Sequence, residues 1–233
     1  VGGQRRHRAP QIGPRLLALL LLLHQLEDED LEEYLGVKTR DSRSHGAGFG
    51  NIDEEIAAAQ QHVSDEIETE HVLALRLYTS AAYNSINEPL RDLERKKPYP
   101  FPVTVHLIAE GLKRLRTVAA DHENAHKAED LWRGMRNLRV TDTFSTDGGT
   151  ELAPLSTTTD MVVALRYAIS PESLLFKVVT NSFMERGVNL EYLSCFPGEA
   201  EHLFPPLTYL RPTGNSQVIE CGMGGSVTVV EVT

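Results

Sequence analysis

Two glutamates separated by one residue, Glu199 and Glu201, are the side chains best spaced for acid–base chemistry. A Pro197-Gly198 turn precedes them and an apolar Leu203-Phe204 pair follows, which predicts an extended strand through the motif. Side chains two positions apart on a strand point the same way, with Cα atoms roughly 6.5 Å apart. Two carboxylates at that spacing repel by roughly 2.5 kcal/mol, so one can stay anionic while the other handles protons. A solvated strand face is the alternative interpretation.

An arginine lies inside a short apolar run, Leu131-Trp132-Arg133-Gly134-Met135, that is predicted to be a strand. A charge buried in a core is costly without a partner, so Arg133 needs one. A phosphate group fits, because the guanidinium fork matches two phosphate oxygens at once. A structural salt bridge to a nearby acid is the alternative for this segment.

A cluster of hydroxyl side chains, Ser156-Thr157-Thr158-Thr159, ends a β-like stretch and is followed by Asp160. The apolar run Met161–Ala168 then predicts a helix, for which Thr159 or Asp160 is a suitable N-cap. The hydroxyl groups can therefore serve a site, or they can serve the cap and the turn.

Length and composition indicate a globular chain of 233 residues, with 41% hydrophobic and 24% charged residues. The net charge of −10 argues against nucleic acid as the main partner. The sequence contains no recognisable metal-ligand spacing and no glycine-rich motif of a doubly wound nucleotide fold. Its two cysteines, Cys195 and Cys221, can form one bridge or none.

The N-terminal region has an ambiguous pattern. Arginines precede the run Leu16–Leu23, which has the outline of a secretory signal, but a buried or amphipathic helix to about Leu35 is the simpler interpretation. Eight apolar residues are too few for a transmembrane segment. Gly36–Asn51 is polar and glycine-containing, as in a linker. Both a secreted and a cytoplasmic location stay open.

The rest of the chain changes from helical to β patterning, which favours an α+β fold. We expect residues 1–51 to hold an N-terminal helix and a linker, and residues 52–233 to form one domain, helical over 52–128 and β-rich over 129–233. The predicted helices are Ile52–Tyr78, Tyr83–Leu93, Val103–Ala120 and Met161–Ala168. The predicted strands are Leu131–Met135, Leu174–Thr180, Asn189–Leu193, His202–Phe204, Gln217–Glu220 and Val227–Val232.

The arginine strand, the Ser-Thr-Thr cluster and the Glu-x-Glu motif follow one another in an order that resembles the mono-ADP-ribosyltransferases. That family builds its site from an Arg, a Ser and a Glu, and the resemblance is closest to the arginine-specific branch, which has the extra upstream glutamate. The similarity extends over roughly residues 75 to 232. Further similar segments are Leu75–Thr79, Tyr83, Ile86-Asn87, Leu90-Arg91, Gly148–Leu152, Phe204–Pro206 and Val229–Val232.

The resemblance implies a fold, a reaction and a role for each matching residue. It implies two small stacked sheets around a cleft for NAD, and an NAD(P)⁺–protein-arginine ADP-ribosyltransferase that uses NAD as co-substrate without a metal. Arg133 and Gly134 would bind the cofactor, with Arg133 on its pyrophosphate, and Ser156 would orient Arg133 or Glu201. Glu201 would hold the ribose and stabilise positive charge as nicotinamide leaves, and Glu199 would receive the acceptor guanidinium. Thr157 and Thr158 would complete the cofactor-binding strand; many members have Ser-x-Ser here, which leaves the orientation of Thr158 open.

Three functions of different classes follow from these patterns. The first is transfer of ADP-ribose to an exposed arginine of an acceptor protein, and its close variant is an NAD glycohydrolase in which water replaces the acceptor. The second is a non-catalytic interaction module that keeps the NAD fold. The third, a helical partner-binding protein with an incidental β tail, is disfavoured by the turn-rich second half of the chain.

Overall fold

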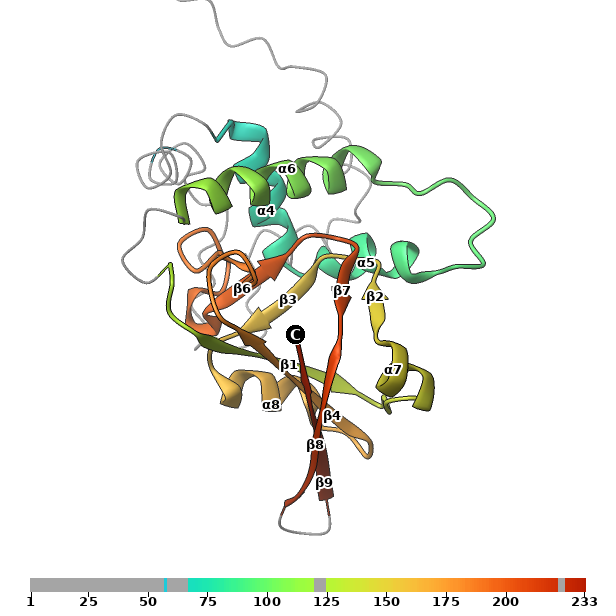
Figure 1. The fold of residues 1–233 in the computed structure, drawn as a ribbon. Helices are drawn as coiled ribbons and strands as arrows, with labels where there is room; N and C mark the ends of the chain where they lie inside the picture. The colour runs from blue at the N-terminus through green and yellow to red at the C-terminus, as the bar shows by residue number, and fades with distance from the viewer. Residues whose placement is uncertain (1–56, 58–66, 120–124, 222–224) are drawn as a thin grey trace, which may run out of the picture.

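The computed structural model describes residue 57 and residues 67–119, 125–221 and 225–233 (Figure 1). Helices come first in this part of the chain and strands later, so the predicted α+β class is confirmed. The helices are α4 (Thr69–Thr79), α5 (Tyr83–Arg91), α6 (Pro102–Ala119), α7 (Asp142–Asp147), α8 (Met161–Ala168) and a 3₁₀ turn η1 (Pro197–Glu199). The strands are β1 (Glu129–Arg136), β2 (Gly149–Glu151), β3 (Leu155–Thr158), β4 (Ser173–Thr180), β5 (Val188–Asn189), β6 (Glu201–Phe204), β7 (Thr208–Leu210), β8 (Pro212–Cys221) and β9 (Gly225–Val232).

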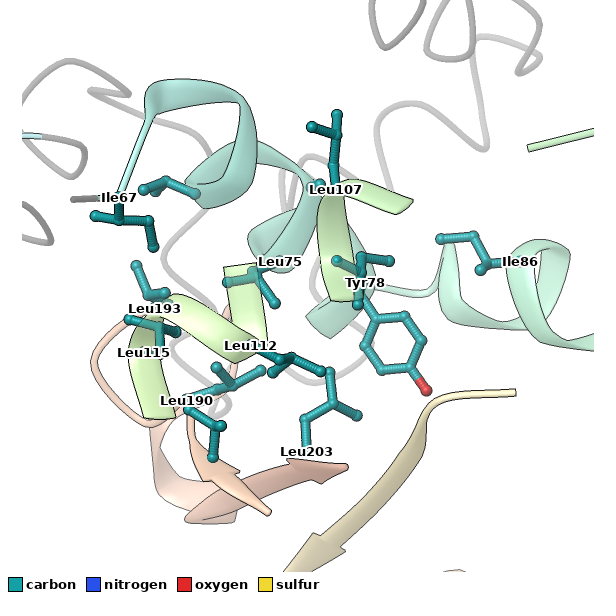
Figure 2. Packing of buried hydrophobic residues seen from close by; sticks show 14 residues of the cluster. Ile67, Leu75, Tyr78, Ile86, Leu107, Leu112, Leu115, Leu190, Leu193 and Leu203 are labelled. Carbon is teal, nitrogen blue, oxygen red and sulfur yellow. The ribbon is translucent and has the colours of Figure 1, made fainter. Parts of the chain in front are cut away.

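Helices α4 and α6 cover one end of the main sheet, where a cluster of buried hydrophobic residues fills the space between them (Figure 2). On α6 the apolar residues Ile108, Leu112 and Leu115 recur at helical spacing and are buried. Gly111 lets the two helices approach closely, because a Cβ there would lie 3.0 Å from a Leu75 methyl group. This layer rests on Leu203 of β6 and so fixes the helices over the strand that begins at Glu201.

The strands form one seven-stranded sheet, in the order β5-β6-β3-β1-β4-β9-β8, and a separate pair β2-β7. Strand β1 pairs with β4 over its whole length, and β3 pairs with β6 over four residues. Between β1 and β3, however, the register contains a single pair, Trp132 with Thr158. The two halves of the sheet are thus joined at one point, and Arg133 follows directly after it.

Helix α8 packs on β1 at a position where only glycine fits. A Cβ on Gly134 would lie 1.9 Å from the main-chain oxygen of Ala164 and 2.8 Å from the main-chain nitrogen of Ala168. On the same face Trp132 packs against the buried cluster of Ala164, Leu175 and Val227. The absence of a side chain at Gly134 therefore sets how closely α8 approaches the sheet.

Most predicted elements occur with bounds shifted by a few residues, and one differs in kind. The predicted strand Asn189–Leu193 is wrong beyond Asn189, because Leu190 and Leu193 turn into the core beneath α6 instead of alternating. The short elements α7, β2 and β7 were not predicted. Of the predicted helix Ile52–Tyr78 the structure describes α4, and the segments Leu16–Leu23 and Gly36–Asn51 lie outside the described residues. Among the described helices, none has the length and apolar character needed to cross a membrane.

Candidate active site

Arg133 extends from β1 toward the start of β3. Its Nη1 donates to the main-chain oxygen of Ser156 at 2.9 Å, and its Nη2 lies 3.9 Å from Oε2 of Glu151. Burial lowers the pKa of the guanidinium, and the charge of Glu151 opposes that shift. Within the described part of the chain, Nε of Arg133 is buried and makes no hydrogen bond. The salt bridge to Glu151 is thus long, and the Nε–H of Arg133 lacks a hydrogen-bond acceptor among the described residues.

The Ser-Thr-Thr cluster forms strand β3, and its three hydroxyl groups have different surroundings. Thr157 Oγ1 donates to the main-chain oxygen of His202 at 2.8 Å, which ties β3 to β6. Thr158 Oγ1 donates to the main-chain oxygen of Glu199 at 2.6 Å and accepts from the main-chain nitrogen of Asp160 at 2.9 Å. Ser156 is half-buried, and its hydroxyl is close enough to Glu201 to lower the pKa of that carboxyl. Thr157 and Thr158 therefore hold the backbone around both glutamates.

The helix after the cluster begins as the sequence predicts. Asp160 is the N-cap of α8, and its side chain accepts a hydrogen bond from the main-chain nitrogen of Val162 at 2.8 Å. The capping interpretation is thus correct for Asp160, and it leaves Ser156 available for the site.

Glu201 opens strand β6 with its side chain buried, at 8% exposure. Burial raises the pKa of this carboxyl to about 7 because the charged form loses its hydration, and the negative charge of Glu199 raises it further. The Ser156 hydroxyl and the positive charge of Arg133 act in the opposite direction. Arg133, Ser156 and Glu201, which are far apart in the sequence, therefore lie close together in the folded chain.

The prediction that one extended strand carries both glutamates is wrong. Glu199 ends the 3₁₀ turn η1, and Ala200 adopts a left-handed conformation at φ 46° and ψ 50° before β6 begins. A residue with a Cβ reaches that region only at a cost of about 1–2 kcal/mol, which the surrounding hydrogen bonds must offset. The turn replaces strand alternation as the reason that the two carboxylates are neighbours.

Glu199 is half-buried and is held by a tyrosine that the sequence did not single out. Tyr167 of α8 donates its hydroxyl proton to Oε1 of Glu199 at 2.7 Å. Burial raises the pKa of Glu199, and the hydrogen bond from Tyr167 lowers it. The two glutamates therefore have distinct environments, one enclosed beside Ser156 and Arg133 and the other nearer the surface beside Tyr167.

Helices α4 and α5 add polar side chains to the same region. The buried Tyr78 hydroxyl donates to the main-chain oxygen of Pro154 at 2.9 Å and accepts from Nδ2 of Asn87 at 3.0 Å. Oδ1 of Asn87 is buried and has no hydrogen-bond partner among the described residues. Tyr83 is partly exposed, and its phenol is close enough to influence the pKa of both Arg133 and Tyr167.

A second arginine joins the site through Glu151. Nε and Nη2 of Arg91 donate to the two oxygens of Glu151 at 2.9 and 3.0 Å, and the same carboxylate lies 3.9 Å from Arg133. Glu151 also accepts from the main-chain nitrogen of Ala153 at 3.0 Å. The sequence points to the Leu90-Arg91 and Gly148–Leu152 segments only through the family resemblance, because they come together only in the folded chain.

The arrangement combines a cationic fork, a hydroxyl group and two carboxylates of different burial. A buried carboxylate beside an arginine can stabilise a positive centre that develops on a bound anion-carrying substrate. A second, more exposed carboxylate can accept a proton from a nucleophile. Among the described residues, no group of three or more His, Cys, Asp or Glu side chains is arranged to hold a metal. Cys195 is a buried thiol, and the side chain of Cys221 lies outside the described residues.

The sequence matches one family model, described as NAD:arginine ADP-ribosyltransferase, over residues 32–220. No curated protein sequence matches the chain.

Solved structures of bacterial ADP-ribosyltransferases share the fold at low sequence identity. HopU1 of Pseudomonas syringae pv. Tomato superposes with a TM-score of 0.58 at 17% identity, covering 89% of this chain and 98% of HopU1. Exoenzyme S of Pseudomonas aeruginosa, solved with human 14-3-3 protein beta and bound to carba-NAD, gives 0.51 at 20% identity, covering 88% of each chain. The Vibrio splendidus toxin Vis, solved with agmatine, gives 0.52 at 19% identity, covering 86% of this chain and 90% of Vis. At these identities the likeness establishes the fold.

Proposed function

The chain belongs to the NAD:arginine ADP-ribosyltransferase family, and we propose that it transfers ADP-ribose from NAD to an arginine side chain of an acceptor protein and releases nicotinamide. The observation that carries this proposal is the pair of glutamates in unlike environments beside Arg133. Glu201 is enclosed with the arginine and Ser156, whereas Glu199 stands nearer the surface, where a second substrate can reach it.

NAD is an anion at its pyrophosphate, and Arg133 suits that group. Its buried Nε has no partner among the described residues, and its long contact with Glu151 can be exchanged for a phosphate oxygen. A charge-assisted hydrogen bond to phosphate is short and strong, and it would give the Nε–H of Arg133 the acceptor that it lacks among the described residues. Arg91, paired with the same Glu151, would add positive charge to this end of the site.

Glu201 suits the bond-breaking step. When the bond between nicotinamide nitrogen and ribose C1′ breaks, its electron pair leaves with nicotinamide and positive charge develops on the ribose. A fixed carboxylate in a water-poor site stabilises that charge far better than one in bulk water. Only the ionised form of Glu201 supplies this stabilisation, and Arg133 and Ser156 favour that form.

Glu199 suits the acceptor. A protonated guanidinium is attracted to a carboxylate but is a poor nucleophile, so it must lose a proton as its nitrogen bonds to ribose C1′. Glu199 would accept that proton and later release it to solvent. NAD and an arginine side chain would thus yield ADP-ribosyl-arginine, nicotinamide and one proton. The description of the matching family and the presence of Glu199 two residues before Glu201 support arginine as the acceptor.

Incubation of the protein with labelled NAD and agmatine, a small guanidinium compound, tests the proposal. We expect ADP-ribosyl-agmatine to accumulate together with nicotinamide. Free ADP-ribose as the sole product at saturating agmatine would contradict arginine transfer and establish the NAD glycohydrolase instead. No product together with no saturable NAD binding would favour the non-catalytic module.

A further inference from the structure

Tyr167 contacts the site from α8, a helix that none of the proposed roles has used so far. It lies near the C-terminal end of that helix with 46% of its surface exposed, and its hydroxyl donates to Oε1 of Glu199 at 2.7 Å. Oε2 of Glu199 makes no hydrogen bond or ion pair with any described residue and is not sealed from solvent. One oxygen of the carboxylate is thus held, and the other is open.

Both partners of this hydrogen bond stand on rigid supports. Helix α8 is seated on β1 at Gly134, and the Arg136 side chain donates to the main-chain oxygens of Tyr167 and Arg166 at 3.1 and 3.2 Å. On the other side, Thr158 fixes the backbone of Glu199 with a hydrogen bond of 2.6 Å. A single phenol hydroxyl therefore connects two anchored elements, which restricts the rotamers that Glu199 can adopt.

We propose that Tyr167 is a positioning residue for the acceptor: it holds Oε1 of Glu199 so that Oε2 is presented to the incoming guanidinium. This proposal rests on the proposed transferase function and assigns a determinant of the choice between guanidinium and water. Hydrolysis of NAD does not need an oriented Glu199, because water carries no charge to be docked. Transfer needs the carboxylate in one orientation at the moment the guanidine nitrogen approaches.

The surroundings of Glu199 make the hydrogen bond matter electrostatically as well. Burial raises the pKa of Glu199, and Tyr167 lowers it. Glu201 on β6 is close enough to feel the charges of Glu199 and of Arg133 on β1, and Tyr167 is close enough to feel Glu201 and Tyr83 on α5. Loss of the Tyr167 hydroxyl raises the pKa of Glu199. When the pH is lowered, Glu199 of the variant therefore becomes protonated at a higher pH than Glu199 of the wild type.

The test compares Tyr167→Phe with the wild-type protein and with a matched control, Tyr209→Phe. The control removes a hydroxyl that donates to the main-chain oxygen of Asp147, at the β7 strand outside the pair of glutamates. Each protein is assayed for transfer to agmatine and for NAD hydrolysis without acceptor, over a range of pH. Both reactions need ionised Glu201, so its protonation lowers both rates alike and does not change the ratio of transfer to hydrolysis. The pH dependence of that ratio therefore reports the protonation of Glu199.

For Tyr167→Phe we expect kcat/KM for agmatine to fall about tenfold, the effect of one hydrogen bond to a charged group, while hydrolysis stays within about twofold. The ratio of transfer to hydrolysis should also decline at a higher pH than in the wild type. Tyr209→Phe should match the wild type in both respects. An unchanged ratio and pH profile in Tyr167→Phe, with wild-type transfer intact, would overturn the role of Tyr167 alone. A wild-type protein that hydrolyses NAD but never modifies agmatine would instead overturn the proposed function, and this inference with it.

Discussion

Arg133 and Ser156, 23 positions apart in sequence, are joined by a hydrogen bond of 2.9 Å from the guanidinium Nη1 to the main-chain oxygen. The bond crosses the place where β1 and β3 share only one residue pair, so it takes over a connection that the sheet does not make there. The guanidinium held in this way also lies close enough to Glu201 for its positive charge to lower the pKa of that carboxyl. Arg133 is therefore both a structural link and the available cation of the site.

Replacing Arg133 by alanine should weaken NAD binding by roughly 10- to 100-fold, the range for losing hydrogen bonds to a charged group. Isothermal titration calorimetry measures the dissociation constant. Arg139→Ala, which removes one positive charge from an exposed pair with Glu172, is the matched control and should bind NAD normally. An unchanged dissociation constant in a folded Arg133→Ala protein would contradict its phosphate role.

Glu201→Gln should stabilise the protein while abolishing its activity. The pKa of Glu201 is raised to about 7 in the folded state, against about 4.5 in an unfolded chain, so folding opposes ionisation between those values. Above pH 7 the wild type bears the full penalty, on the order of 3 kcal/mol, which the neutral amide avoids. Below about pH 4 both side chains are neutral in both states and the difference should vanish.

Urea denaturation at pH 4 and pH 8 measures this difference in free energy of unfolding. Glu231→Gln is an opposing control, because hydrogen bonds from Asn215 and Thr213 lower the pKa of that partly exposed carboxyl. Its ionised form is the favoured one in the folded state, so its replacement should cost stability at pH 8. That cost should disappear only when the pH falls below the lowered pKa of Glu231. A Glu201→Gln protein that is equally stable to the wild type at pH 8 would mean that Glu201 titrates normally.

Gly134→Ala should displace α8 from the sheet. The added methyl group would meet the backbone of Ala164 at 1.9 Å, and backbone cannot rotate away as a flexible side chain can. Overpacking of this kind costs about 1–3 kcal/mol or more, which thermal unfolding would detect. Because Tyr167 is on the same helix, transfer to agmatine should fall more than NAD hydrolysis. A normal melting temperature would show that α8 adjusts without strain. The cofactor-binding role assigned to Gly134 by resemblance stays a prediction.

Thr158→Val should loosen the turn that carries Glu199. The substitution keeps the β-branched shape but removes both the 2.6 Å hydrogen bond to the main-chain oxygen of Glu199 and the acceptor for Asp160. We expect a loss of transfer activity of several-fold, restored by Thr158→Ser, which returns the hydroxyl. Equal activity in the valine and serine variants would indicate that shape, not hydrogen bonding, matters here.

The class of fold and the three residues Arg133, Ser156 and Glu201 could be predicted from the sequence. Each of these residues lies in a local pattern: an arginine in an apolar run, hydroxyl groups before a helix, and paired glutamates. The geometry of Glu199 could not be predicted. A left-handed Ala200 has no sequence signature, since that conformation usually calls for glycine or asparagine. Tyr167 and Arg91 could not be predicted as site residues for another reason. Tyr167 is 32 positions from its partner Glu199, and Arg91 is 60 positions from its partner Glu151, so each pair meets only after folding.

The division of labour between the two glutamates is tested most directly by product analysis of Glu199→Gln and Glu201→Gln with labelled NAD and agmatine. We expect Glu201→Gln to form neither ADP-ribosyl-agmatine nor free ADP-ribose. Glu199→Gln should lose transfer to agmatine while retaining part of the NAD hydrolysis, because the enclosed carboxylate beside Arg133 is intact. Parallel loss of both products in the two variants, with both proteins folded, would contradict the separate roles assigned to these side chains.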